Sequence, residues 1–243
     1  MHLTYVMKIK TMKTTFLKRL LLCVGMVGAL SSCSLDDDSN YGNYPQPDLA
    51  YGLIINASPA SGDLFFYADA NQINNAALNY AKAAGYYNFV LGNRVLTVKN
   101  ASGQVLASDT ITLTRDKVFS AFAVNTFNNI ELVTYNDSLV LPASGKARVR
   151  FINLSPDADS IHVSGTTQTF ANGLAFKEAT EFIEVPAGNY DFTFKDSESE
   201  DTLFHDTSVK FVDGRVYTIY TKGYKTPPAN SNDTFSTEVV RNL

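Results

Sequence analysis

The clearest chemistry in this chain belongs to the thiol of Cys33, which follows Ser31 and Ser32 at the end of an apolar run over residues 20–30. Basic residues precede that run: Lys13, Lys18 and Arg19. A helix that crosses a membrane needs about 20 apolar residues, so this run is too short to span one. A basic start, a short apolar core and small residues before the cut are typical of a cleaved export signal. We therefore predict a lipoprotein signal over residues 1–32, after which the Cys33 thiol carries a diacylglyceryl group.

Cleavage before Cys33 would tie the mature chain to a membrane through lipid. Each buried CH₂ group contributes about 0.8 kcal/mol, and two or more acyl chains give stable anchoring. An ordinary secretory signal with a chance cysteine is the alternative interpretation. Met12 is the expected translation start.

Three carboxylates, Asp36, Asp37 and Asp38, follow the predicted lipid site within a tether over residues 33–48. This arrangement resembles that of surface lipoproteins of Gram-negative gut anaerobes, in which an acidic run after the cysteine is associated with export. The resemblance implies an outer-membrane lipoprotein that faces the cell exterior. A solvated linker is the alternative, because runs of like charge are usually disordered.

Composition excludes several classes of function. The signal holds five of the 20 basic residues and none of the 24 acidic ones, which leaves the mature chain with 15 basic residues and a net charge of −9. Nucleic-acid binding needs a basic surface for the phosphates, so no nucleic-acid partner is expected. Cys23 is removed with the signal, and acylation uses the thiol of Cys33. Disulfides, thiolate catalysis and cysteine-based zinc sites are therefore not expected.

The remaining side chains with catalytic potential form no recognisable motif. His162 lies in a strand-like run and His205 precedes Asp206, but no nucleophile motif accompanies them. We therefore expect a protein that is not an enzyme and that uses no cofactor.

Asp157, Asp159 and Ser160 offer oxygens in one short loop. Calcium takes six to eight oxygen ligands, and the late glutamate of a calcium loop is missing here. We expect no metal site, with calcium near Asp157 and Asp159 as the alternative. The acidic residues 196–201 are expected to form a solvated hairpin tip.

Four hydroxyl residues follow an Asp and precede an isoleucine or a leucine: Thr110, Ser138, Ser160 and Thr202. The pattern resembles the O-glycosylation signal of the same class of lipoproteins. The alternative is that Asp-Ser and Asp-Thr mark turns and strand ends, which these residues favour. Modification requires an exposed hydroxyl, and Ser138 and Ser160, which lie next to predicted loops, are the preferred sites.

The mature chain repeats itself at a pitch near 97 residues. Residues 55–59 (Ile-Asn-Ala-Ser-Pro) match residues 152–156 (Ile-Asn-Leu-Ser-Pro), and further matches follow in the same order as far as 118–119 and 216–217. One ordered alignment with small insertions indicates a duplicated domain.

Both copies are rich in short runs of aromatic and β-branched residues, such as residues 94–98 and 216–220. Gly, Pro, Asn and Asp divide these runs, and spacings of roughly 8–12 residues are typical of a β-sandwich. We predict an all-β protein with two tandem sandwich domains, over residues 49–140 and 146–243. Each copy has its own strand signals, so we expect residues 146–243 to fold alone.

Residues 147–163 (Ala-Arg-Val-Arg-Phe-Ile-Asn-Leu-Ser-Pro-Asp-Ala-Asp-Ser-Ile-His-Val), 185–190 and 214–219 resemble the domain-of-unknown-function family numbered 4397. The first copy resembles it more loosely. The resemblance implies immunoglobulin-like or transthyretin-like sandwiches in a bacterial surface lipoprotein. It implies no activity and no catalytic residues.

The expected function is a non-enzymatic binding or structural role in the cell envelope. The expected partners are the membrane, through the lipid, and a glycan or an envelope or host protein. One alternative is a glycan-binding accessory of an outer-membrane nutrient-uptake system, with Tyr86 and Tyr87 among the candidate stacking residues, although the chain has no tryptophan. Another is a fimbrial or adhesin-type subunit, against which the closing strand at 234–241 argues, because it completes its own domain.

Overall fold

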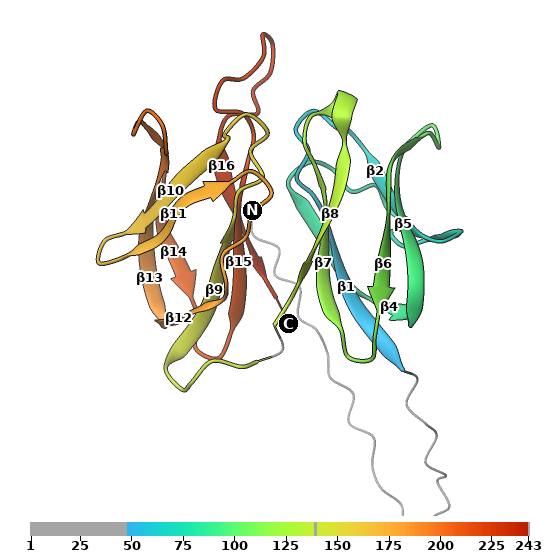
Figure 1. The fold of residues 1–243 in the computed structure, drawn as a ribbon, viewed down its shortest axis with the longest axis horizontal. Helices are drawn as coiled ribbons and strands as arrows, with labels where there is room; N and C mark the ends of the chain where they lie inside the picture. The colour runs from blue at the N-terminus through green and yellow to red at the C-terminus, as the bar shows by residue number, and fades with distance from the viewer. Residues whose placement is uncertain (1–47, 139, 243) are drawn as a thin grey trace, which may run out of the picture. The chain divides into compact units, whose positions relative to one another are not determined.

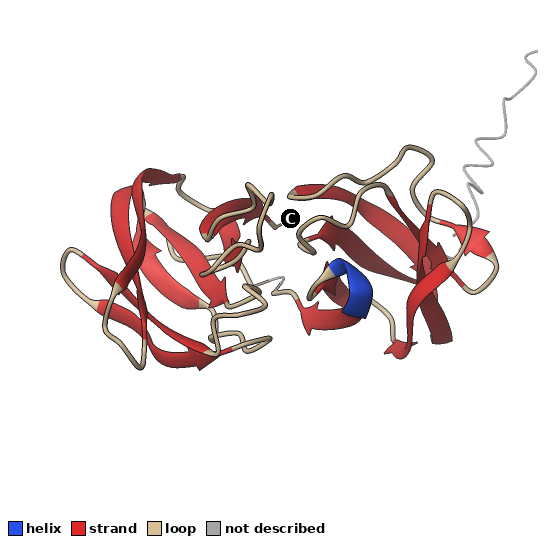
Figure 2. Ribbon diagram, turned by 90° about the horizontal axis from the view of Figure 1, so that it is seen from above, coloured by secondary structure: helices blue, strands red, loops and turns tan. Residues whose placement is uncertain are grey.

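The computed structural model describes residues 48–138 and 140–242, which are mostly β-strand (Figures 1 and 2). The predictions for Cys33 and for Asp36, Asp37 and Asp38 lie outside the described residues. Within the described ranges, one 3₁₀ helix spans Phe127–Asn129, and no helix has the length and hydropathy needed to cross a membrane. The all-β prediction is confirmed.

The two copies contain the same strands in the same order. The first copy has β1 (Leu49–Asn56), β2 (Leu64–Ala68), β3 (Asn71–Gln72), β4 (Lys82–Val90), β5 (Gly92–Asn100), β6 (Val105–Leu113), β7 (Val118–Val124) and β8 (Glu131–Asn136). The second copy has β9 (Lys146–Ile152), β10 (Ser160–Gly165), β11 (Thr169–Ala175), β12 (Ile183–Pro186), β13 (Gly188–Asp196), β14 (Thr202–Phe211), β15 (Val216–Lys222) and β16 (Ser236–Arg241). Each strand of one copy therefore has a counterpart in the other.

Each copy is built from two four-stranded sheets. The first copy has the orders β4-β1-β7-β8 and β3-β2-β5-β6, and the second has β12-β9-β15-β16 and β11-β10-β13-β14. β1 pairs with β7 in parallel, as β9 does with β15, and the other pairs of named strands are antiparallel. The prediction of two tandem β-sandwiches is confirmed.

Alternating side chains fill a separate core in each copy. In β5, Leu96 and Val98 are buried, and at the corresponding positions of β13 the buried residues are Phe192 and Phe194. Successive residues of a strand point to opposite faces, so every second residue enters the core. Burial of an apolar side chain of this size stabilises the fold by about 1.5–3 kcal/mol relative to exposure.

Strands β7 and β15 are buried on both faces. In β7, Phe119, Ala121 and Ala123 enter the core of the first copy, whereas Phe122 and Val124, on the other face, belong to a different apolar cluster. A strand that is buried on both faces reads as a continuous apolar run rather than as an alternation. The run over residues 118–124 carries this signal in the sequence.

The apolar cluster that contains Phe122 and Val124 joins the two copies. It contains Ile55, Phe122 and Val124 from the first copy together with Ile152 and Tyr220 from the second. The Phe122 and Tyr220 rings meet edge to face, with centroids 5.3 Å apart. The described residues consequently form one compact unit, although each copy also has a core of its own.

The acidic tip at residues 196–201 departs from its prediction at Asp196, whereas residues 198–201 are exposed as expected. It does form the turn of the β13–β14 hairpin, but the Asp196 side chain is only 6% exposed rather than solvated. The carboxylate accepts a hydrogen bond from Lys225 Nζ at 2.7 Å and another from the Ser199 backbone N–H at 2.9 Å. A buried charge needs such partners, and the sequence pattern alone did not reveal them.

Candidate functional site

The repeated Ile-Asn-x-Ser-Pro motif has a structural role. Asn56 and Asn153 are fully buried, and each donates through Nδ2 to a backbone carbonyl, that of Leu78 at 3.0 Å and that of Leu174 at 3.2 Å. Each Oδ1 accepts the backbone N–H of the serine two residues further on. The asparagine thus satisfies buried backbone groups where the chain leaves β1 or β9. This duty explains why the motif occurs in both copies.

Asp157 also holds a loop in place. Its Oδ1 accepts the backbone N–H of Lys225 at 2.6 Å, and its Oδ2 accepts that of Thr226 at 2.8 Å. Asp159 is exposed. Among the described residues, no group of three or more His, Cys, Asp or Glu side chains lies close enough together to hold a metal ion. The Asp157 carboxylate is thus occupied in fastening the loop between β15 and β16.

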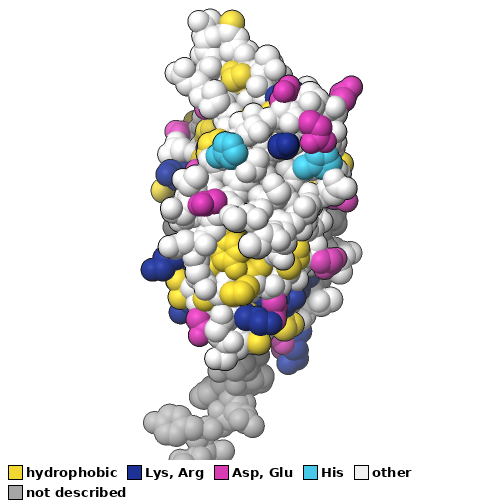
Figure 3. Space-filling view, turned by 90° about the vertical axis from the view of Figure 1, so that its left-hand side faces the viewer, with side chains coloured by type: hydrophobic (Ala, Val, Ile, Leu, Met, Phe, Trp, Pro, Cys, Tyr) yellow, Lys and Arg dark blue, Asp and Glu magenta, His cyan; other side chains and the backbone are white. Residues whose placement is uncertain are grey.

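The two histidines lie on one sheet of the second copy. His162 is in β10 and His205 in β14, on either side of β13, and they stand apart on the face that Figure 3 shows. His162 Nδ1 accepts the Gly173 backbone N–H at 3.0 Å, and His205 Nδ1 lies 3.1 Å from the hydroxyl of Thr193. Each ring therefore makes local contacts, and the geometry does not combine the two histidines.

A buried polar network links the copies. The Arg150 and Asp137 side chains are 3% and 1% exposed and form an ion pair. Asp137 also accepts the hydroxyls of Ser120 at 2.6 Å and Tyr86 at 2.7 Å, and burial raises the pKa of Tyr86. Arg150 also donates to Thr218 Oγ1 at 2.9 Å. Every partner is engaged, so the network fastens the copies and offers no free reactive group.

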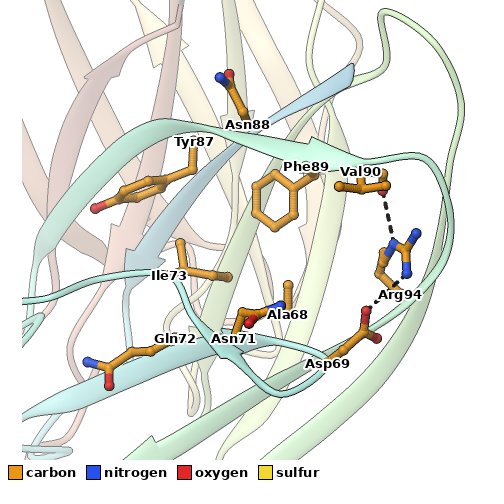
Figure 4. A pocket seen from close by; sticks show the side chains of 10 residues that line it. All are labelled: Ala68, Asp69, Asn71, Gln72, Ile73, Tyr87, Asn88, Phe89, Val90 and Arg94. Carbon is orange, nitrogen blue, oxygen red and sulfur yellow. Dashed lines mark hydrogen bonds and ion pairs between the residues drawn. The ribbon is translucent and has the colours of Figure 1, made fainter. Parts of the chain in front are cut away.

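One pocket of the first copy combines an apolar wall with a pair of charged side chains, and Figure 4 shows it. Its volume is about 320 Å³, and it lies between β4 and the segment that leads from β2 through β3. Ile73, Tyr87 and Phe89 supply its apolar wall, with the Phe89 ring directed into the space (Figure 4). An ion pair between Asp69 and Arg94 closes one end.

The charges at that end are fixed by hydrogen bonds. Arg94 Nη1 lies 3.1 Å from Asp69 Oδ2, while its Nε donates to the Val90 carbonyl at 3.0 Å and its Nη2 to the Leu91 carbonyl at 2.6 Å. Asp69 Oδ1 accepts the Val95 backbone N–H at 3.0 Å. The Val95 N–H and the Arg94 guanidinium lower the pKa of Asp69. The carboxylate is therefore ionised at neutral pH and its charge is balanced by Arg94.

Sequence reasoning did not identify this pocket. Tyr86 and Tyr87 were both candidate stacking residues, but neighbours in a strand point to opposite faces, so only one of them can line a given site. Tyr86 joins the buried network, whereas Tyr87 lines the pocket. Asp69 and Arg94 lie 25 residues apart, so only the pairing of β2 with β5 brings them together.

The predicted glycosylation sites occupy different surroundings. Thr110 in β6 and Thr202 in β14 are exposed, and Ser160 is half-buried. Ser138 is also half-buried, and its hydroxyl oxygen accepts hydrogen bonds from Arg148 Nη1 at 2.9 Å and the Val140 backbone N–H at 3.1 Å. Exposure therefore favours the two threonines over the serines that lie next to loops.

The fold defines a tandem β-sandwich protein, and the pocket between β4 and β3 lies in its first copy. The chain belongs to the family described as Domain of unknown function (DUF4397), whose model matches residues 50–164 and 161–240. The match covers both copies and confirms the expected family. Among curated proteins, none matches the chain.

Several solved structures resemble the chain weakly. One is the pneumococcal glycogen-degrading virulence factor SpuA, at 12% identity and a TM-score of 0.23, over 70% of this chain and 20% of that one. A streptococcal virulence factor that binds alpha-glucan matches at 14% identity and a TM-score of 0.22, over 70% of this chain and 92% of that one. A candidate cell adhesion protein from Bacteroides uniformis ATCC 8492 matches at 11% identity and a TM-score of 0.28, over 81% of this chain and 99% of that one. The chain spans only about a fifth of the length of SpuA. TM-scores this low give no basis for assigning the function of these proteins to this chain.

Proposed function

We propose that this protein is a non-enzymatic lipoprotein of the outer membrane that faces the cell exterior and binds a ligand through its first sandwich. The observation that carries the binding role is the pocket of about 320 Å³ in the first copy, which has apolar and charged side chains side by side. A volume of this order lies within the range of small-molecule sites. The charged groups at the pocket neutralise each other, which suits binding better than proton transfer or nucleophilic attack.

Anchoring follows from the residues before the first sandwich. In this proposal the Cys33 thiol carries the lipid, and Asp36, Asp37 and Asp38 direct the protein to the outer face. The membrane is then a partner through the lipid alone, and the sandwiches are displayed to the medium. A lipid-anchored binding protein of this kind needs no cofactor.

A glycan-binding accessory of a nutrient-uptake system is the more specific form of this proposal. The pocket favours it, because a half-buried tyrosine ring beside a carboxylate and a guanidinium suits a sugar. A fimbrial or adhesin-type subunit is less favoured. β8 pairs with β7 and β16 with β15 within their own copies, so each closing strand completes its own sheet.

Metabolic labelling with an alkyne palmitate analogue tests the anchoring. Wild-type protein should be labelled and found in the membrane fraction, whereas Cys33→Ala should lose both properties. Replacing Asp36, Asp37 and Asp38 with alanine should retain the label but protect the protein from protease added to whole cells. A labelled Cys33→Ala protein in the membrane would contradict the lipid site, and unchanged protease access would contradict the export role.

A pull-down on immobilised polysaccharides tests the binding role. Wild-type protein, purified without its signal and with Cys33→Ala, should be retained by at least one neutral polysaccharide. The comparison variant is Ala68→Gly with Ile73→Phe, in which a phenylalanine ring is placed in the pocket. Equal retention of this variant and of the protein with the native pocket would contradict binding through the first sandwich.

A further inference from the structure

We infer that the pocket of the first copy binds one unit of a neutral saccharide, an inference that rests on the proposed binding function. The argument begins with the second copy, which serves as an internal control. It has the same strands and sheet orders, so each pocket residue has a counterpart there. Differences between the copies at these positions show what keeps the pocket open.

The second copy fills the equivalent space with an aromatic ring. The pairing of Tyr67 with Gln72 in the first copy corresponds to that of Ser164 with Thr169 in the second. Ile73, the residue after Gln72, is therefore the counterpart of Phe170. Phe170 is 7% exposed, and its ring lies 5.2 Å from that of Phe151 and 5.4 Å from that of Phe192. Ile73 is only half-buried and extends into the pocket (Figure 4).

Ala68 keeps the ring out of the first copy. Its counterpart is Gly165, where an added Cβ atom would lie only 2.9 Å from the Phe170 ring. A side chain at this position is therefore incompatible with a phenylalanine in the Phe170 pose. The first copy has both changes that leave the space empty, the smaller residue at 73 and the methyl group at 68.

A third difference places charge at the end of the pocket. Arg94 occupies the position of Tyr190, whose ring stacks on Phe192 with an interplanar angle of 9°. The first copy thus has a guanidinium where the second has part of an aromatic stack. Three of the five N–H groups of Arg94 are used by Asp69, Val90 and Leu91, so two remain for a ligand.

These groups suit a neutral hydroxylated ligand. A hydroxyl group both donates and accepts, and here it can accept from Arg94 and donate to Asp69. The exposed amides of Asn71 and Asn88 lie at the rim and offer both roles as well. The balanced pair of charges gives no net attraction for an anion or a cation. The half-buried Tyr87 ring provides an apolar face for the C–H side of a sugar, while Phe89 is 4% exposed and forms the floor beneath it.

Pocket size limits the ligand. A volume of about 320 Å³ is at the lower end of small-molecule sites, which span roughly 300–1,000 Å³. It therefore accommodates a single sugar unit, either free or exposed on a longer chain. A site of this size with partly exposed polar groups is expected to bind one unit weakly, in the millimolar range.

NMR titration of the mature chain with Cys33→Ala tests the inference. The probes are glucose, galactose, mannose and N-acetylglucosamine, with glucuronate as the charged comparison. At least one neutral sugar should shift the amide resonances of residues 68–73 and 87–94, and should bind more tightly than glucuronate. Tighter binding of glucuronate, or shifts confined to other residues, would overturn the inference.

Two variants distinguish the pocket from the rest of the surface. Ala68→Gly with Ile73→Phe reproduces the second copy and should weaken sugar binding about tenfold or more, whereas Ala68→Gly alone should retain it. Arg94→Met should fold normally and weaken binding, because the free N–H groups are lost. Unchanged affinity in both the filled variant and Arg94→Met would refute the site. If no sugar shifts the pocket while lipid labelling and surface access hold, this inference fails and the anchored surface role remains.

Discussion

Asp137 and Arg150 are polar residues at which a single substitution is expected to destabilise the protein strongly. Both side chains are almost completely buried, and they pair across the two copies. Removing one partner of a buried pair leaves an uncompensated charge, which costs about 3–5 kcal/mol. Burial lowers the pKa of Arg150, while the Asp137 charge opposes that effect. The pair therefore contributes specificity to the docking of the copies as well as stability.

We predict that Asp137→Ala lowers the free energy of unfolding by about 3–5 kcal/mol, as measured by urea denaturation. Glu184→Ala is the matched control, because Glu184 pairs with Lys146 at 3.2 Å in an exposed position. Exposed pairs contribute about 0–1 kcal/mol. Equal losses in the two variants would show that the buried network is not the stabilising element.

The lowered pKa of Asp196 predicts that the protein loses stability at low pH. The hydrogen bond from Lys225, followed by the backbone N–H groups of Ser199 and Glu198, lowers its pKa from 3.8 to about 2. A carboxyl group whose pKa is depressed by folding stabilises the protein above its unfolded value, and this contribution is lost as the pH falls through the folded value. The stabilisation should therefore be complete above about pH 4 and disappear towards pH 2.

Thermal melting between pH 6 and pH 2 measures this effect in the wild type and in Asp196→Asn. The wild type should have the higher melting temperature at pH 6, and the difference should shrink as the pH falls from 4 to 2. A constant difference across this range would mean that the Asp196 carboxylate does not titrate in the folded protein as proposed.

Corresponding strands of the two copies meet in the shared apolar cluster. Ile55 corresponds to Ile152 and Phe122 to Tyr220, and all four residues belong to this cluster. An interface in which equivalent positions face each other is the kind found in two-fold homodimers. The polar network breaks this symmetry, because Arg150 corresponds to Leu53. The ion pair can therefore form in one orientation only.

Edge strands carry the exposed candidate modification sites. β6 and β14 each lie at one end of a sheet, and unpaired edges are sites of unwanted strand pairing. We predict that protein from the native host carries O-glycans at Thr110 and Thr202 rather than at Ser138. Intact-mass analysis should show added mass that falls in Thr110→Ala and Thr202→Ala but not in Ser138→Ala. A mass equal to that of the lipidated polypeptide would refute the modification.

The molecule as a whole has two independent cores and one shared cluster. Residues 146–243 retain their own core, so we still expect this fragment to fold cooperatively. Separation would expose Ile152, Leu154 and Tyr220 and would leave Arg150 without its carboxylate partner. The isolated fragment should therefore melt at a lower temperature than the two copies together and self-associate.

Circular dichroism melting and light scattering test this prediction. Arg150→Met in the fragment should recover part of the lost stability, because it removes a charge that has no partner there. A monomeric fragment as stable as the intact chain would show that the shared cluster contributes nothing. A fragment without a cooperative transition would show that the second core needs the first copy.

The sequence by itself determined the duplication, the all-β class and the sandwich architecture, because these follow from local periodicity, turn residues and repeated motifs. Only the tertiary structure decided that Asp137 meets Arg150, that Asp196 is buried and that the first copy has a pocket. These features depend on which distant strands pair and on how large the side chains facing one space are. Asp69 and Arg94, or Ala68 and Ile73, have no local signature, so strand register alone makes them neighbours.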